Sequence, residues 1–258
     1  MGASRQGRAK NLAKVAEPLR DGPAGATQKS RANVKGKIVE FLWYLNKENR
    51  SKRTIFSYKQ YLELLMKYGA DLENPESVKE TVAKQETWSE NTRRMASVVY
   101  KGFANFAGIP FKCPKFNVNR KLPFIPLEAE IDALIAGSSK RLAALLQLLK
   151  EVPIRIGEAL RLEWVDIDFE RNVCYVNKTE KDGRPRALKI SNKLQSMLKA
   201  LPKKNNKLFS TATYKGMNNQ MITTRKRLAN KLQNPRLDRI HFHTFRHWKA
   251  TMEYQKNS

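Results

Sequence analysis

The stretch RIGEALRLEWVDID, residues 155–168, decides the fold of the second half of this chain together with the segment that follows it. That segment is FERNVCYVNKTEKDGRPRALKI, residues 169–190. Residues 155–162 predict a short helix. Residues 173–177 are rich in β-branched and aromatic side chains and predict a strand, and residues 186–190 predict a second one. The turn residues between these strands, TEKDGRP, join them into a β-hairpin.

Helices flank this hairpin on both sides in the sequence. Apolar residues three or four positions apart predict them, and a serine or proline stands where several of them begin. The expected helices occupy residues 127–137, 142–149, 191–201, 219–234 and 243–255. We therefore expect a mainly α protein with a small antiparallel β-hairpin or three-stranded sheet.

The first half of the chain has a different organisation. Residues 36–110 repeat apolar side chains at helical spacing and predict a bundle of about four helices. Residues 111–125 are basic, proline-containing and without period, so we expect a linker. Residues 1–35 carry eight Lys or Arg against two acids and no sustained apolar period, which predicts a flexible basic arm. Residues 126–258 form the second expected domain.

The charge of the chain is strongly positive and unevenly placed. Its 50 Lys and Arg against 24 Asp and Glu give a formal net charge of +26. Residues 1–35 contribute +6 and residues 171–258 contribute +17, which is +23 of that total. A lysine-rich surface adapted only for stability pairs its lysines with glutamates, and these are missing here. The sequence therefore predicts a polyanionic partner.

Several classes of protein are excluded by the sequence. No stretch reaches the roughly 18 to 20 consecutive apolar residues of a membrane span, and the first residues lack the apolar core of a signal peptide. Cys113 and Cys174 are far apart and predict two buried thiols rather than a disulfide framework. Three histidines without a carboxylate cluster do not predict a metal site. We expect a soluble, cytoplasmic, DNA-associated protein.

Three separated segments carry candidate chemistry. Arg155 begins the short helix, Lys178 and Lys181 lie in or beside the hairpin turn, and His243 and Arg246 lie in the last predicted helix. A reaction at a phosphodiester needs cations that grip the non-bridging oxygens, and two arginines from different segments do this bidentately. It also needs an acid that protonates the departing oxygen, which a lysine on a turn can supply.

The second half of the chain resembles the catalytic domain of the tyrosine recombinases, the phage-type integrase and Xer family. The resemblance lies in the order of three features: RIGEALRLEWVDID, a hairpin with a lysine in its turn, and HTFRH. The resemblance covers residues 126–258, and the preceding helical segment is similar to the family's core-binding domain. It implies that Arg155 and Arg246 grip the phosphate, that His243 opens a His-x-x-Arg box and that Glu158 supports Arg155. It implies no metal, no other cofactor and no external energy source.

The catalytic lysine and the DNA contacts are further expectations. Counting back from Arg186, which looks like the arginine that opens the family's next strand, favours Lys181, and Lys178 remains the alternative. We expect His247 in a supporting role that is mainly packing. The residues expected to contact DNA elsewhere are Arg93, Arg94, Lys101, Arg225 and Arg227.

The main departure from the family concerns the nucleophile. The attacking tyrosine of the family lies well beyond the His-x-x-Arg box, and only twelve residues follow Arg246. Tyr254 lies eight residues on in the same predicted helix, where the family has packing residues. We therefore expect a catalytic domain that stops before its nucleophile: an incomplete sequence, an interrupted gene, or a tyrosine supplied by another protomer.

The expected function is site-specific DNA recombination or integration at double-stranded attachment sites, with a homotetrameric synapse implied by analogy. The alternative is a catalytically dead DNA-binding remnant or regulator that occupies attachment sites. A basic RNA-binding protein is a weaker rival, because the ordered Arg, Lys and His-x-x-Arg series argues against it. Neither the target sequence nor the choice between integration and dimer resolution follows from the residues.

Overall fold

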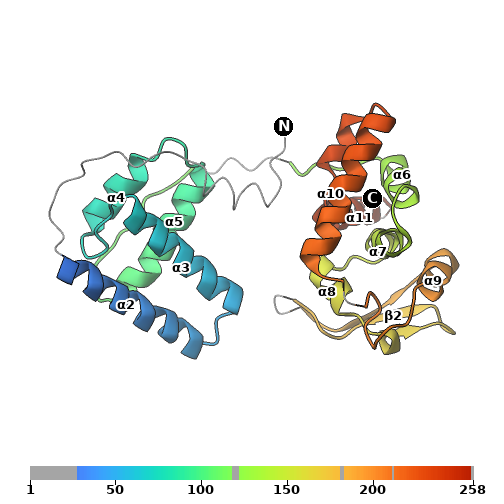
Figure 1. Ribbon diagram of the computed structural model, residues 1–258, viewed down its shortest axis with the longest axis horizontal. Coiled ribbons are helices and arrows are strands. Elements are labelled where there is room, and N and C mark those ends of the chain that lie inside the picture. The colour runs from blue at the N-terminus through green and yellow to red at the C-terminus, as the bar shows by residue number, and fades with distance from the viewer. Residues whose placement is uncertain (1–27, 118–121, 181–182, 211, 257–258) are drawn as a thin grey trace. The chain divides into compact units, whose positions relative to one another are not determined.

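The computed structural model describes residues 28–117, 122–180, 183–210 and 212–256. The chain divides into two compact units, one within residues 3–120 and the other within residues 121–258 (Figure 1). Among the described residues, no helix is both long and apolar enough to cross a membrane.

The first unit is helical, and three of its helix starts have a local cause. Ser51, Asn74 and Ser89 cap three of the helices by accepting hydrogen bonds from backbone N–H groups of the first turn. The helices are α2 (Gln28–Lys47), α3 (Lys52–Lys67), α4 (Pro75–Ala83) and α5 (Glu90–Phe106). Helix α2 begins at Gln28, inside the segment expected to be a flexible arm, whereas residues 1–27 lie outside the described residues.

Aromatic side chains form the centre of this unit. Phe41 of α2 meets Phe103 of α5 edge to face, with the ring centroids 5.7 Å apart, and both rings are buried. Tyr100 is also buried and its hydroxyl donates to the Leu72 carbonyl at 3.1 Å, so its polar end is satisfied. The predicted four-helix bundle therefore has its own hydrophobic core.

The second unit is built around one central helix. The helix α7 (Lys140–Glu151) is buried from Leu142 to Leu149, and α6, α9 and α11 pack against it (Figure 1). The other helices are α6 (Glu128–Ala136), α8 (Ile156–Arg161), α9 (Asn192–Lys199), α10 (Tyr214–Lys231) and α11 (Phe242–Lys256). Short 3-10 turns, η1 (Trp164–Asp166) and η2 (Pro235–Arg239), complete the helical part of this unit. Because α11 packs on α7, the last helix is fixed beside the segment that leads into α8.

A three-stranded antiparallel sheet lies between α8 and α9 in the sequence. Its strands are β1 (Ile167–Asp168), β2 (Val173–Val176) and β3 (Arg186–Lys189), in that spatial order. The predicted hairpin is β2–β3, with Val176 opposite Arg186 at the turn end. Since Arg186 opens β3, this register places its side chain at the end of the sheet nearest the turn. The predicted fold class, mainly α with a small antiparallel sheet, is confirmed.

Candidate functional site

Arg155 and Glu158 form one local unit at the start of α8. The chain leaves α7 at Pro153 and Ile154, and Arg155 is the extended residue before the first turn of α8. Its backbone N–H donates to Glu158 Oε2 at 2.9 Å, which turns the Glu158 side chain back toward the helix start. The Glu158 side chain is completely buried, so its charge requires partners.

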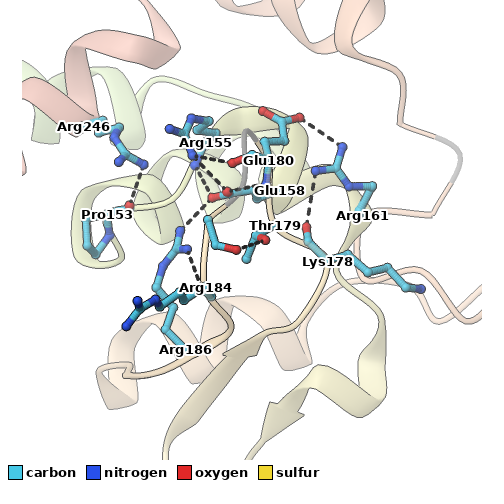
Figure 2. A network of polar contacts seen from close by, with 11 residues as sticks. Pro153, Arg155, Glu158, Arg161, Lys178, Thr179, Glu180, Arg184, Arg186 and Arg246 are labelled. Atoms are coloured by element: carbon cyan, nitrogen blue, oxygen red, sulfur yellow. Dashed lines mark hydrogen bonds and ion pairs between the residues drawn. The ribbon is translucent and has the colours of Figure 1, made fainter. Parts of the chain in front are cut away.

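Glu158 finds those partners in three segments of the chain (Figure 2). Its Oε1 accepts from the Arg155 guanidinium at 3.2 Å and from the Glu180 backbone N–H at 3.0 Å, and its Oε2 accepts from Arg186 Nη2 at 2.8 Å. Burial by itself raises the pKa of Glu158, but the two backbone donors and the Arg186 charge lower the pKa below its ordinary value. The side chain is therefore a carboxylate that holds two arginines.

Arg246 comes to the same place from the last helix. Its Nη1 donates to the Pro153 carbonyl at 3.1 Å, which fixes the guanidinium of α11 over the segment before Arg155 (Figure 2). Burial lowers the pKa of Arg246, and the positive charges of Arg155 and Arg186 lower it further. Two guanidinium groups therefore pair with Glu158, and Arg246 adds a third positive charge beside them. This excess of positive charge suits an anion.

The side chains of this cluster remain open to solvent. Arg155 and Arg186 keep 26% and 27% of their side-chain surface exposed, and Arg246 is half-buried. His243 is exposed and lies three residues before Arg246 on α11, so both side chains belong to one face of the helix. His247 is half-buried, and its ring meets that of His243 edge to face at 4.5 Å. His243 thus lies on the face of α11 that carries Arg246, and Arg246 comes close enough to Arg155 for their charges to repel.

The structure describes only one of the two candidate lysines, Lys178. Lys181 lies outside the described residues, and the structure describes the hairpin up to Glu180. Lys178 is exposed, and its ammonium pairs with Glu163 Oε1 at 2.6 Å. Its pKa is raised, because Glu163 accepts its hydrogen bond and attracts its charge. A raised pKa is the wrong direction for a group that must release a proton near neutral pH.

The expected DNA contacts of the first unit have different local surroundings. Arg93 donates twice to the Gln85 carbonyl, at 2.8 and 3.2 Å, and holds the connection between α4 and α5. Arg94 is exposed and donates to Asn91 at 3.2 Å, and Lys101 is exposed on the same helix. Arg94 and Lys101 are thus accessible to a ligand, and Arg93 is mainly a structural brace.

The two expected DNA contacts on α10 also separate. Arg227 is exposed and donates to the Gly137 carbonyl. The expectation for Arg225 needs correction: only 4% of the residue is exposed, and Nη1 donates to the Ile240 carbonyl at 2.9 Å and contacts His241 Nδ1 at 2.6 Å. Because a phosphate cannot reach a buried guanidinium, Arg225 braces the entry to α11 instead of contacting DNA.

Sequence reasoning missed two residues of the cluster. Arg186 served only as a marker for the position of the turn, yet it makes the shortest hydrogen bond to Glu158. Glu180 was not considered, although its backbone binds both Glu158 and Arg155. The available signal was position, since Glu180 and Arg186 stand at the two ends of the turn between the predicted strands.

Comparison with known proteins places this geometry in a family. Residues 127–257 match the family described as the phage integrase family, which is half of the chain, so the chain belongs to that family. This confirms the resemblance to the tyrosine recombinases. It is similar to tyrosine recombinase XerA of Pyrococcus horikoshii, with 27% identity over 163 residues, 61% of this chain and 56% of that protein. A second XerA, from Thermococcus kodakarensis, is 26% identical over 173 residues and is covered to 60%. The chain thus spans less than two thirds of the length of these relatives.

Solved structures share the fold at lower identity. The Tn1549 transposon integrase in complex with transposon right end DNA aligns with a TM-score of 0.65 and 14% identity, over 86% of this chain and 87% of that one. The lambda integrase dimer bound to a COC' core site aligns with a TM-score of 0.66 and 13% identity, over 87% and 91%. At these identities the likeness shows the fold.

Proposed function

We propose that this protein acts in site-specific DNA recombination or integration as a tyrosine recombinase, and that it binds double-stranded DNA and grips one phosphodiester between Arg155 and Arg246. The observation that carries the proposal is the cluster in which Arg155 and Arg186 bind the buried carboxylate of Glu158 and Arg246 adds a third positive charge beside them. Two guanidinium groups from α11 and from the start of α8 provide the fork geometry that matches non-bridging phosphate oxygens.

The roles of the site residues follow from the chemistry of such a phosphate. Arg155 and Arg246 stabilise the negative charge that develops on the phosphoryl oxygens, and Glu158 holds Arg155 in place. His243 lies on the same face as Arg246 and donates to the same oxygens. Lys181, which lies between the two hairpin strands in the sequence, protonates the departing oxygen, and Lys178, which pairs with Glu163, is the alternative.

The attacking phenol is not assigned to Tyr254. This residue lies on α11 eight positions after Arg246, and a rise of about 1.5 Å per residue separates the two by about 12 Å along the helix axis. A phosphotyrosyl bond must form within contact distance of the phosphorus while the departing oxygen leaves. Cleavage therefore uses a tyrosine other than Tyr254, and a longer form of the chain or another protomer meets this requirement.

The two units receive separate roles in this proposal. Residues 36–110 form a core-binding domain that contacts the duplex, residues 111–125 are the linker, and residues 126–258 belong to the catalytic domain. Arg94 and Lys101 contribute phosphate contacts from α5. Recombination joins two sites, and a homotetrameric synapse on paired duplexes provides the four protomers that this exchange needs.

The first experiment measures DNA binding on a duplex selected by the protein from a pool of random-sequence DNA. Affinity is expected to fall steeply with salt, by about a thousandfold between roughly 50 and 200 mM if about six phosphates are neutralised. The double variant Arg155→Lys, Arg246→Lys should weaken binding at fixed salt, because lysine lacks the fork. The control Lys231→Gln removes a cation at the far end of α10. Salt-insensitive binding contradicts the proposal.

A second experiment separates the recombinase from a DNA-binding regulator. The selected duplex is nicked on one strand at successive positions, so that a cleaved fragment diffuses away and traps a covalent complex. A covalent product that contains this protein supports the recombinase. Tight binding without any such product supports the regulator.

A further inference from the structure

We propose that Glu180 and Arg161 are positioning residues for Arg155: their ion pair fixes the segment that follows strand β2 against α8 and so sets the direction of the Arg155 guanidinium. The inference rests on the proposed phosphate contact of Arg155 and adds two residues to the machinery that supports it.

The backbone of Glu180 forms half of the cradle around Arg155. Its carbonyl accepts from Arg155 Nη1 at 3.2 Å, and its N–H donates to Glu158 Oε1 at 3.0 Å. The same Arg155 nitrogen also lies 3.2 Å from Glu158 Oε1. One guanidinium nitrogen of Arg155 is therefore shared between α8 and the hairpin. Any movement of Glu180 changes its backbone contacts with Arg155 and with Glu158.

Arg161 ties that part of the hairpin to α8 at two points. Its Nη1 donates to Glu180 Oε1 at 3.0 Å, and its Nη2 donates to the Lys178 carbonyl at 3.3 Å (Figure 2). The two side chains are 40% and 34% exposed, so this pair adds little to folding stability. Its effect is geometric, because a planar fork that grips residues 178 and 180 fixes the direction of the chain between them.

Gly157 provides the space for this arrangement. A Cβ atom at position 157 would lie 2.1 Å from Glu180 Oε1, much closer than two such atoms can approach. The Glu180 carboxylate therefore rests directly on the backbone of the first turn of α8. Alanine at this position would displace a flexible carboxylate rather than the backbone, and it favours the helix more than glycine does. Gly157→Ala should thus disrupt the Arg161–Glu180 ion pair without lowering folding stability.

The test uses the full 258-residue protein with ¹⁵N-labelled arginine side chains. The Arg155 Nε–H signal is identified by its loss in Arg155→Lys, and its order parameter reports how firmly the side chain is held. In the wild type we expect a rigid value, and in Glu180→Gln and Gly157→Ala a value below about 0.6. The matched control is Glu163→Gln, which removes the acid from the Glu163–Lys178 pair and leaves the Arg155 cradle intact.

Inorganic phosphate then probes the function of the positioned arginine on the same signal. Removal of a nearby carboxylate by itself strengthens anion binding, whereas loss of Arg155 positioning weakens it. We expect Glu180→Gln and Gly157→Ala to weaken phosphate binding by about three- to tenfold, the worth of one hydrogen bond. Because the two residues act as one pair, the double variant Arg161→Gln, Glu180→Gln should be no weaker than either single variant.

The outcomes separate this inference from the proposed function. If Arg155 keeps its order in both Glu180→Gln and Gly157→Ala, or if Glu180→Gln binds phosphate more tightly with Arg155 unchanged, the positioning role is wrong. If the wild-type Arg155 signal does not respond to phosphate, the proposed phosphate contact is wrong, and the order parameters still decide whether Glu180 positions Arg155. A loss of order in Glu163→Gln equal to that in Glu180→Gln also contradicts the inference.

Discussion

Replacing Glu158 by glutamine removes the acceptor on which the cluster depends. The carboxylate accepts four hydrogen bonds: from the Arg155 backbone, the Arg155 guanidinium, the Glu180 backbone and Arg186. Glutamine has nearly the same shape but keeps one oxygen, and its NH₂ group is a donor that faces other donors. At least two of the four donors therefore lose their acceptor, and the two arginines lose their only carboxylate in this network.

The magnitude follows from these contacts. Each buried donor without a partner costs about 1 to 3 kcal/mol, so two cost about 2 to 6 kcal/mol. Breaking a buried ion pair from one side costs about 3 to 5 kcal/mol, and the partial exposure of Arg155 and Arg186 lets water compensate part of it. We expect a loss of about 2 to 4 kcal/mol. For a unit of this size that lowers the melting temperature by roughly 10 °C.

The assay is thermal unfolding of wild type, Glu158→Gln and Glu163→Gln at neutral pH, followed by near- and far-ultraviolet circular dichroism. Glu163→Gln changes the same functional group in a solvent-facing pair, so its melting temperature should stay close to that of the wild type. The reasoning is refuted if Glu158→Gln melts within about 2 °C of the wild type.

Three further predictions concern protons and thiols. Because the folded state lowers the pKa of Glu158, the stability from this carboxylate is present above its unfolded pKa of about 4.3 and is lost as the pH falls through the lower folded value. The acid unfolding curves of wild type and Glu158→Gln should therefore approach each other as the pH falls below about 4.3. The expectation of two buried thiols holds for Cys174 but not for Cys113, which is half-exposed. Burial raises the pKa of Cys174 to about 12, so iodoacetamide at pH 8 should label Cys113 and spare Cys174 in mass spectrometry; equal labelling contradicts the burial of Cys174. On a duplex whose departing oxygen is replaced by the better leaving group sulfur, cleavage should recover in Lys181→Ala but not in Lys178→Ala if Lys181 is the proton donor.

Much of the fold could be predicted because its signals are local. Asn74, Ser89 and Ser191 cap helices where the sequence placed helix starts, since each needs only N–H groups two or three residues away. Two starts were misplaced. Helix α10 begins at Tyr214 rather than at residue 219, because Thr213 caps it ahead of the basic, weakly periodic stretch. Helix α2 begins at Gln28 rather than near residue 36, in a segment of the sequence that has no sustained apolar period.

The site was only partly predictable. The spacing of Arg155 and Glu158 within one turn and of His243 and Arg246 within another fixes each pair, since three residues along a helix share a face. The contacts of Glu158 with Glu180 and Arg186 join positions 22 and 28 residues apart, and nothing in the local sequence specifies them. The composition gives the net positive charge of the chain. It does not show which arginine side chains are exposed.

The sequence by itself determined the class of protein, the order of its helices and strands, and the local pairs Arg155–Glu158 and His243–Arg246, because periodicity, capping and motif order are written in neighbouring residues. Only the tertiary structure decided that Arg225 is internal and Arg186 part of the site, and that Glu180 rests on Gly157. The physical reason is that burial and partnership of a charge depend on which distant segments pack around it. All arginines of the chain have the same side chain. Packing decides which guanidinium groups are exposed and which are enclosed.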